Sequence, residues 1–113
     1  MHLDLTVLRG YIGDNPKTQQ RILLKFETLL IDSREKVIGA VNDGTLDVVR
    51  SACHALKSSS RYAGAIELGH LSEQLEAIAA GRSPGPIEPV LARFIEECSA
   101  VEQALTETIG DDG

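Results

Sequence analysis

The sequence has 113 residues, of which 42% are hydrophobic and 25% are charged, and its formal net charge is −6 at pH 7. This length is enough for one domain with its own hydrophobic core, but it excludes a core domain joined to a nucleotide-binding domain. The acidic balance excludes a general nucleic-acid-binding protein, because the phosphate backbone requires a positively charged surface.

The hydrophobic pattern has a helical period along the whole chain, and no segment has the apolar–polar alternation of a strand. The predicted helices span about residues 3–11, 16–41, 46–63, 65–80 and 87–108. Asn15 or Asp14 can cap the second helix, with Pro16 in its first turn. Thr45 is predicted to cap the third helix, and Gly81 to end the fourth.

Four long amphipathic helices joined by short connections predict an all-α fold, an up-down antiparallel four-helix bundle with a short extra N-terminal helix as a lid. We expect residues 1–113 to form one domain. Cys53 and Cys98 lack the spacing of a metal site or a disulfide framework, so both thiols should be reduced and buried. No apolar run approaches the roughly 20 residues that cross a bilayer, and no signal peptide is visible, so we expect a cytoplasmic protein without membrane contact of its own.

The third predicted helix has two distinct faces when its residues are placed about 100° apart. Its polar face consists of Asp47, Arg50, Ser51, His54, Lys57, Ser58 and Arg61. Its apolar or small face consists of Val48, Val49, Ala52, Cys53, Leu56, Ser59, Ser60 and Ala63. His54 lies at the centre of the polar face, in the middle of the helix, and we therefore expect its ring to be exposed to solvent.

Three cationic residues neighbour the histidine on this helix surface: Arg50, Lys57 and Arg61. A positive cluster around one imidazole in an acidic protein suits a phosphoryl group on the histidine, an acidic pocket on a partner, or both in turn. The distal nitrogen of a neutral imidazole can attack phosphorus, and Lys57 can supply a cation to the phosphoryl oxygens. The small side chains of Ser51 and Ser58 leave the ring of His54 open to a docking partner.

Other interpretations compete with this one. An exposed histidine among cations is more often part of a solvated surface than a site. His70, on the fourth helix beside Glu67 and Gln74, is expected to be an ordinary surface histidine. A zinc site needs three or four converging ligands, which the sequence does not offer. The loop from Gly81 to Pro86 lacks the GK[ST] ending of a phosphate-binding loop, so no ATP-binding motif is present. An enzyme with His54 as general base is disfavoured, because no carboxylate obviously orients the ring.

One segment resembles a known family. The sequence around the central histidine reads His54-Ala55-Leu56-Lys57-Ser58-Ser59-Ser60, followed by Gly64-Ala65 and Leu68. This run resembles the signature around the phosphorylated histidine of histidine phosphotransfer (HPt) domains, which reads His-x-Leu-Lys-Gly, two small residues and then Gly-Ala. A looser similarity covers most of the chain and includes Leu3-Asp4, Phe26 and Leu75-Glu76. The family glycine after the lysine is Ser58 here, which is still small.

The resemblance implies that His54 accepts a phosphoryl group, that Lys57 stabilises this group, and that the partner is a response-regulator receiver domain. We therefore expect a phosphorelay intermediate that takes a phosphoryl group from a receiver aspartate onto His54 and passes it to another receiver aspartate. The predicted partner-binding residues are Arg50, Ser51, Ser58 and Arg61.

This interpretation makes the chain a phosphocarrier and not an enzyme, with kinase activity only if it is part of a larger hybrid sensor kinase. It predicts no metal or cofactor on this chain, and Mg²⁺ on the partner receiver domain only. It also predicts a hybrid or sensor histidine kinase as a further partner, and a monomeric state. The alternative is a helical binding module that docks a receiver or kinase domain without being phosphorylated.

Overall fold

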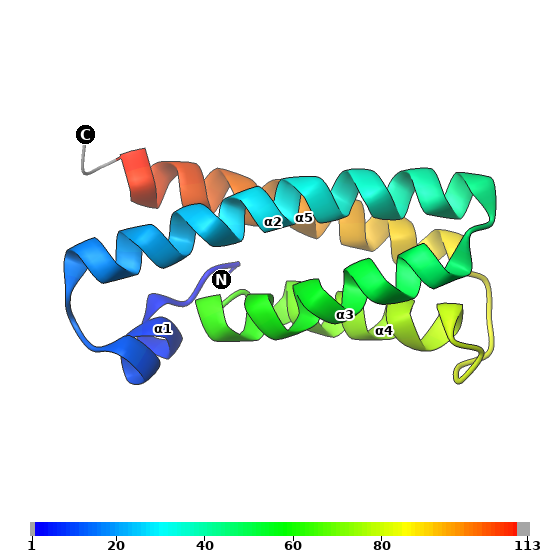
Figure 1. Cartoon of the computed structure of the whole chain (residues 1–113), viewed down its shortest axis with the longest axis horizontal. Helices are drawn as coiled ribbons and strands as arrows, with labels where there is room; N and C mark the ends of the chain where they lie inside the picture. The colour runs from blue at the N-terminus through cyan, green and yellow to red at the C-terminus, as the bar shows by residue number, and fades with distance from the viewer. Residues whose placement is uncertain (1, 111–113) are drawn as a thin grey trace.

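The computed structural model describes residues 2–110 and confirms the all-α prediction, because these residues form five helices and no strand. The helices are α1 (Leu5–Ile12), α2 (Pro16–Asp43), α3 (Leu46–Ala63), α4 (Ile66–Ala79) and α5 (Glu88–Gly110). The predicted domain also included Met1 and residues 111–113, which lie outside the described residues. The four long helices run in alternating directions, and α2 and α4 each pack against both α3 and α5 (Figure 1).

Local hydrogen bonds fix where the helices begin. α1 begins at Leu5 and not at residue 3, because Asp4 caps it: the carboxylate accepts from the backbone N–H and the hydroxyl of Thr6. Asn15 caps α2, and its side-chain oxygen lies 3.0 and 3.2 Å from two backbone nitrogens of the first turn. Thr45 occupies the predicted N-cap position of α3, but its backbone lies outside the extended region typical of caps and its side chain makes no capping hydrogen bond.

The ends of the helices also differ slightly from the predicted bounds. α2 continues to Asp43, beyond the expected end at residue 41, because the chain reverses only at Gly44. Gly44 has a φ of 73°, and its N–H bonds to carbonyl oxygens of the last turn of α2. α5 likewise continues to Gly110, beyond the expected end at residue 108.

The hydrophobic core lies between the four long helices. Its largest fully buried side chains are Phe94, Leu8, Leu30, Leu56, Leu68, Leu75, Leu105, Val37, Val49 and Val101. Because Leu8 belongs to α1, the short helix is part of the core and not only a lid. Tyr11 of α1 also stacks on Tyr62 of α3, with ring centroids 4.7 Å apart.

The N-terminal segment crosses the turn between α3 and α4 at Gly64. The backbone N–H of Asp4 donates to the carbonyl oxygen of Gly64 at 2.9 Å. Gly64 has a φ of 94°, and a Cβ atom at this position would lie 2.0 Å from the carbonyl oxygen of Asp4. Only glycine fits here, so this residue fixes both the α3–α4 turn and the path of the N-terminus.

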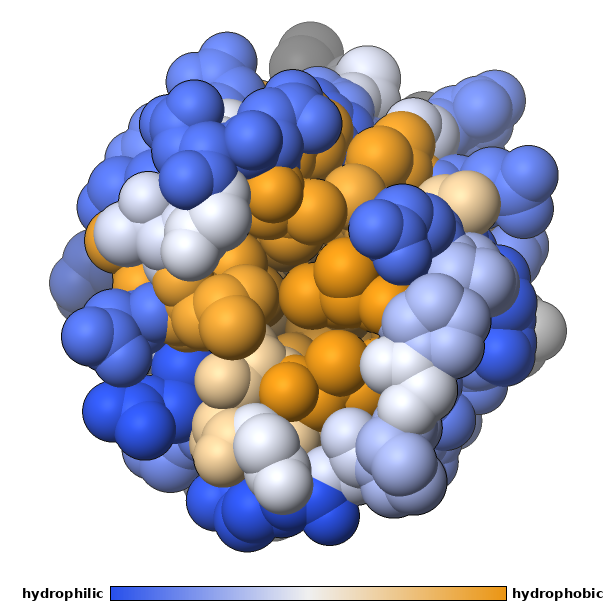
Figure 2. All heavy atoms as spheres, turned by 90° about the vertical axis from the view of Figure 1, so that its right-hand side faces the viewer, coloured by the Kyte–Doolittle hydropathy of each residue, from blue (hydrophilic) through white to orange (hydrophobic). Residues whose placement is uncertain are grey.

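The end of the bundle opposite α1 has a core that is less completely covered by polar residues. Figure 2 looks onto the end that holds the α2–α3 turn and the α4–α5 loop, and it shows apolar side chains gathered in the middle with polar residues around them. At this end Leu46 is exposed, and Ile87 and Val90 are only partly buried. Across the described part of the chain, no helix combines the length and the apolar character needed to cross a membrane.

Candidate functional site

His54 lies in the middle of α3, and its predicted exposure is confirmed, since its side chain is 67% exposed. The residues that α3 buries in the core are Val49, Cys53, Leu56, Ser60 and Ala63. Val48 was predicted on the buried face, but it is exposed, because the first turn of α3 lies at the incompletely covered end of the bundle. Ser59, also expected to point inward, is only half-buried.

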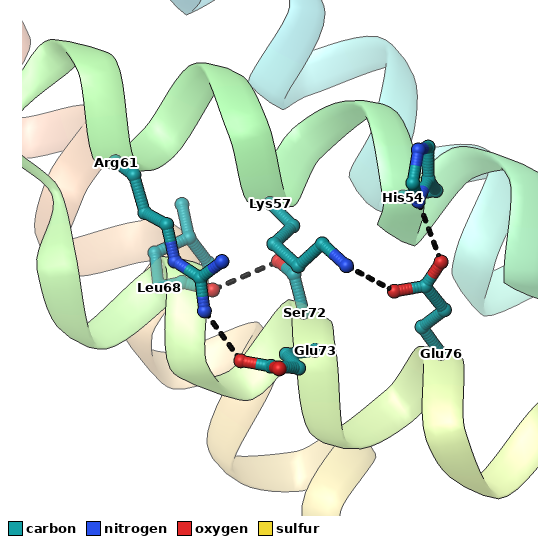
Figure 3. Close-up of polar contacts among 7 residues, drawn as sticks. All are labelled: His54, Lys57, Arg61, Leu68, Ser72, Glu73 and Glu76. Atoms are coloured by element: carbon teal, nitrogen blue, oxygen red, sulfur yellow. Dashed lines mark hydrogen bonds and ion pairs between the residues drawn. The ribbon is translucent and has the colours of Figure 1, made fainter. Parts of the chain in front are cut away.

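A carboxylate on the neighbouring helix orients the imidazole ring. Oε2 of Glu76, on α4, lies 2.7 Å from Nδ1 of His54 (Figure 3). A carboxylate can only accept in such a contact, so Nδ1 carries the proton and the lone pair of the neutral ring is on Nε2. Our expectation that no carboxylate orients this ring was therefore wrong. The residues are 22 positions apart, and only the packing of α4 on α3 brings them together.

The packing of α4 on α3 follows from small residues on one face of α4. Gly69, Ser72 and Glu76 are spaced three and four residues apart, and all three are buried. A Cβ atom on Gly69 would lie only 3.1 Å from Cγ of Arg61, so the glycine lets the two helices approach closely. Glu76 occurs two turns further along this face, where its carboxylate reaches the polar face of α3.

Lys57 shares the same carboxylate. Its Nζ lies 2.7 Å from Oε1 of Glu76, while His54 occupies Oε2 (Figure 3). The side chain of Lys57 is only 18% exposed, so its ammonium is less accessible than the predicted polar face implied. The hydrogen bond from Lys57, together with the one from His54, holds the pKa of Glu76 below its ordinary value although burial acts in the opposite direction. Glu76 is therefore a carboxylate at neutral pH.

The predicted partner-binding residues have different surroundings. Arg61 pairs with Glu73 of α4, so its charge is largely satisfied within the chain (Figure 3). Arg50 is about half-exposed and has only a long contact, 3.9 Å, with Asp47. Ser51 and Ser58 are both exposed, and each lines a groove between α2 and α3.

Two residues near His54 were not singled out for a role from the sequence, Glu76 and Arg82. The sequence indicates Glu76 only through the loose family similarity of Leu75-Glu76. The signal that could have found it is a charged residue at a buried position, in register with Gly69 and Ser72 on α4. Arg82 lies in the loop after α4 and lines a groove together with His54 and Glu76. No periodicity marks a loop residue, so the sequence carried no signal for it.

The other candidates remain outside this site. Cys53 and Cys98 are free and buried, and burial raises the pKa of each thiol to about 12. His70 is exposed on α4. His2 contacts the carboxylate of Glu97 at 2.9 Å. Within residues 2–110, no three histidine, cysteine or acidic side chains converge in the way that a metal site requires.

Comparisons with known proteins identify a family and a similar fold. The family model described as Hpt domain matches residues 12–108. The crystal structure of histidine-containing phosphotransfer protein B from Pseudomonas aeruginosa PAO1 is similar to this chain, with a TM-score of 0.85 and 19% sequence identity. The similarity covers 97% of this chain and 96% of that one, and at this identity it shows the fold alone. The search of curated proteins gave no match.

Proposed function

The chain belongs to the Hpt domain family, whose role is histidine phosphotransfer in phosphorelays, and on this premise we propose that His54 is the residue that carries the phosphoryl group. Hpt proteins work with receiver domains and kinases, and we propose that a receiver domain docks over α3 to exchange the group with this histidine. We further propose that the exchange runs between two receiver aspartates, with this chain as the intermediate.

The observation that carries this proposal is the hydrogen bond between Nδ1 of His54 and Glu76. It keeps the proton on Nδ1 and leaves the lone pair of Nε2 free on a side chain that is two-thirds exposed. A phosphorus electrophile on a docked protein can reach such a nitrogen, whereas a histidine buried in the core would be out of reach. The same carboxylate stabilises the positive charge that the ring acquires when Nε2 forms a bond.

In the proposed transfer, the lone pair of Nε2 attacks the phosphorus of a receiver aspartyl phosphate in line with the leaving oxygen. The P–N bond forms as the P–O bond breaks, and the electron pair of the broken bond returns to the receiver carboxylate. No proton leaves Nε2, because none is bound there, and the proton on Nδ1 stays with the ring facing Glu76. We expect no cofactor on this chain, and Mg²⁺ on the receiver domain only.

Lys57 is proposed to stabilise the transferred group from its place beside Glu76. In the unphosphorylated chain its ammonium neutralises the carboxylate at 2.7 Å. Once the ring is phosphorylated, Glu76 faces a cationic imidazole, and the flexible side chain of Lys57 is free to turn one of its donors toward the phosphoryl oxygens. Lys57 therefore contributes a point charge in both states.

The surface proposed for receiver docking runs along α2 and α3, on the side of His54 that faces away from α4. One groove of about 420 Å³ includes Phe26, Ser58 and Tyr62, and a second of about 490 Å³ includes Ser51. Leu29 lines both grooves, so the two form one apolar strip beside the histidine. A lysine stands on each groove: Lys25 and Lys36. An apolar surface flanked by cations suits a partner that presents an apolar face next to an acidic pocket.

The test is transfer of labelled phosphate from a phosphorylated receiver domain in the presence of Mg²⁺. We expect acid-labile, alkali-stable label on the wild type, none on His54→Gln, and wild-type label on His70→Gln, which removes another exposed histidine of the same chain. A complex without label would support the non-phosphorylated binding module instead. Label that persists in His54→Gln would assign the phosphoryl group to another residue and refute the proposal.

A further inference from the structure

A groove lies on the N-terminal side of His54, and the proposed transfer gives no role to the two arginines that line it. It has a volume of about 390 Å³, and it lies where the first half of α3 faces the end of α4. Its lining residues are Asp47, Arg50, Ser51, His54, Glu76 and Arg82. Two guanidinium groups thus share a groove with the imidazole, one from α3 and one from the loop after α4.

The backbone of Arg82 is held in place by the end of α4. Its N–H donates to the carbonyl oxygen of Ala77 at 2.9 Å, and the N–H of Gly81 donates to that of Ile78 at 3.0 Å. These two bonds form a Schellman motif, which requires a positive φ just after the helix, and Gly81 has a φ of 75°. The backbone of Arg82 is therefore held against the end of α4, although the residue lies in a loop.

The charges around the groove leave a positive excess. The carboxylate of Glu76 is already neutralised by Lys57 at 2.7 Å. Asp47 is 93% exposed, and its 3.9 Å contact with Arg50 is too long for a strong pair. Arg82 makes no ion pair with any residue in the range 2–110. Two arginines facing one weak counter-charge suit an oxyanion with more than one negative charge.

We propose that Arg82, together with Arg50, binds the phosphoryl oxygens of phosphorylated His54 from this groove. Lys57 then contacts the group from the C-terminal side of His54, and the two guanidinium groups contact it from the N-terminal side. Guanidinium groups donate two parallel hydrogen bonds to phosphate oxygens, which a lysine cannot do. The inference rests on the proposed function, because it needs the phosphoryl group to be on His54.

The experiment uses the isolated protein, phosphorylated with the chemical donor phosphoramidate and observed by ³¹P NMR as a function of pH. A nearby guanidinium stabilises the doubly charged phosphoryl group, so in Arg82→Gln the titration midpoint of this group should move to higher pH by about 0.5 pH unit. Arg93→Gln removes the same charge from an exposed site on α5 and should leave the midpoint unchanged. Arg82→Lys keeps a positive charge, so its titration midpoint should lie between those of the wild type and Arg82→Gln.

The possible failures are distinguishable. If the wild type gives no phosphohistidine signal, or if the signal persists in His54→Gln, the proposed function itself fails. If the signal is on His54 but Arg82→Gln and Arg93→Gln titrate alike, the phosphoryl group does not contact Arg82 and only the present inference is overturned. Arg82 is an exposed loop residue, so its substitution should leave the fold intact, which circular dichroism of each variant checks.

Discussion

Replacing Glu76 with glutamine tests the arrangement around His54 most directly. The substitution keeps the shape of the side chain but removes the negative charge that two neighbours share, Nδ1 of His54 and Nζ of Lys57, each at 2.7 Å. A glutamine can turn its amide NH₂ toward Nδ1 and donate to it. That contact would place the ring proton on Nε2 and block the nitrogen that we propose to attack phosphorus.

The size of the effect follows from the exposure of the two partners. A fixed wrong tautomer can cost a factor of about 10⁴ in a buried catalytic triad, but the ring of His54 is 67% exposed and can exchange its partner for water. We therefore expect transfer to slow by about 10- to 100-fold. Removing one partner of a buried ion pair costs about 3–5 kcal/mol, but Lys57 can extend into water, so a loss of stability of about 1.5 kcal/mol is expected.

The assay is rapid-quench measurement of transfer from a phosphorylated receiver domain, alongside urea unfolding followed by circular dichroism. Glu73→Gln is the matched control, because it makes the same change on the same helix at the exposed partner of Arg61. This control should transfer within about twofold of wild type and unfold within about 0.5 kcal/mol of it. If Glu76→Gln transfers at the wild-type rate, the carboxylate does not set the tautomer of His54 and the reasoning fails.

Three further predictions concern stability and reactivity. Gly64→Ala should lower the free energy of unfolding by about 3 kcal/mol, because it combines a positive φ with a 2.0 Å clash. Gly39→Ala is the control: this glycine lies within α2 with open space around it, so the substitution should raise the free energy of unfolding by about 0.5–1 kcal/mol. Urea unfolding of both variants checks this. Cys53 and Cys98, with pKa values raised to about 12, should react with a thiol reagent at pH 8 only as fast as the chain unfolds, and an immediate reaction would contradict their burial. The pKa of Glu76 is lowered in the folded chain, so the stability that its carboxylate gives to the fold should be complete near neutral pH and lost as the pH falls below about 4.5. The difference in the free energy of unfolding between wild type and Glu76→Gln should therefore shrink at low pH. A difference that is independent of pH would contradict this role of the carboxylate.

The sequence alone determined the features that depend on local spacing. Apolar periodicity indicated an all-helical chain, and the polar arc of the third helix indicated that His54 is exposed, because a two-faced helix must turn its polar side to solvent. The caps were less predictable: Asn15 has the backbone geometry that aims a capping oxygen, and Thr45 does not. Asparagine and threonine are both common capping residues, but residue type alone does not specify the backbone angles that aim the side chain at the first turn.

Only the tertiary structure decided what surrounds the histidine. Glu76 reaches His54 because small residues on α4 let the two helices approach closely. Arg82 lines a groove with both residues because α4 ends next to this part of α3. Lys57 is largely buried, because its ammonium turns toward α4 to pair with the carboxylate of Glu76. Helical periodicity specifies the face on which a residue lies, but it does not specify the helix that packs on that face or its register. Those depend on side-chain volumes summed over the whole core, and they set the charges around the exposed ring.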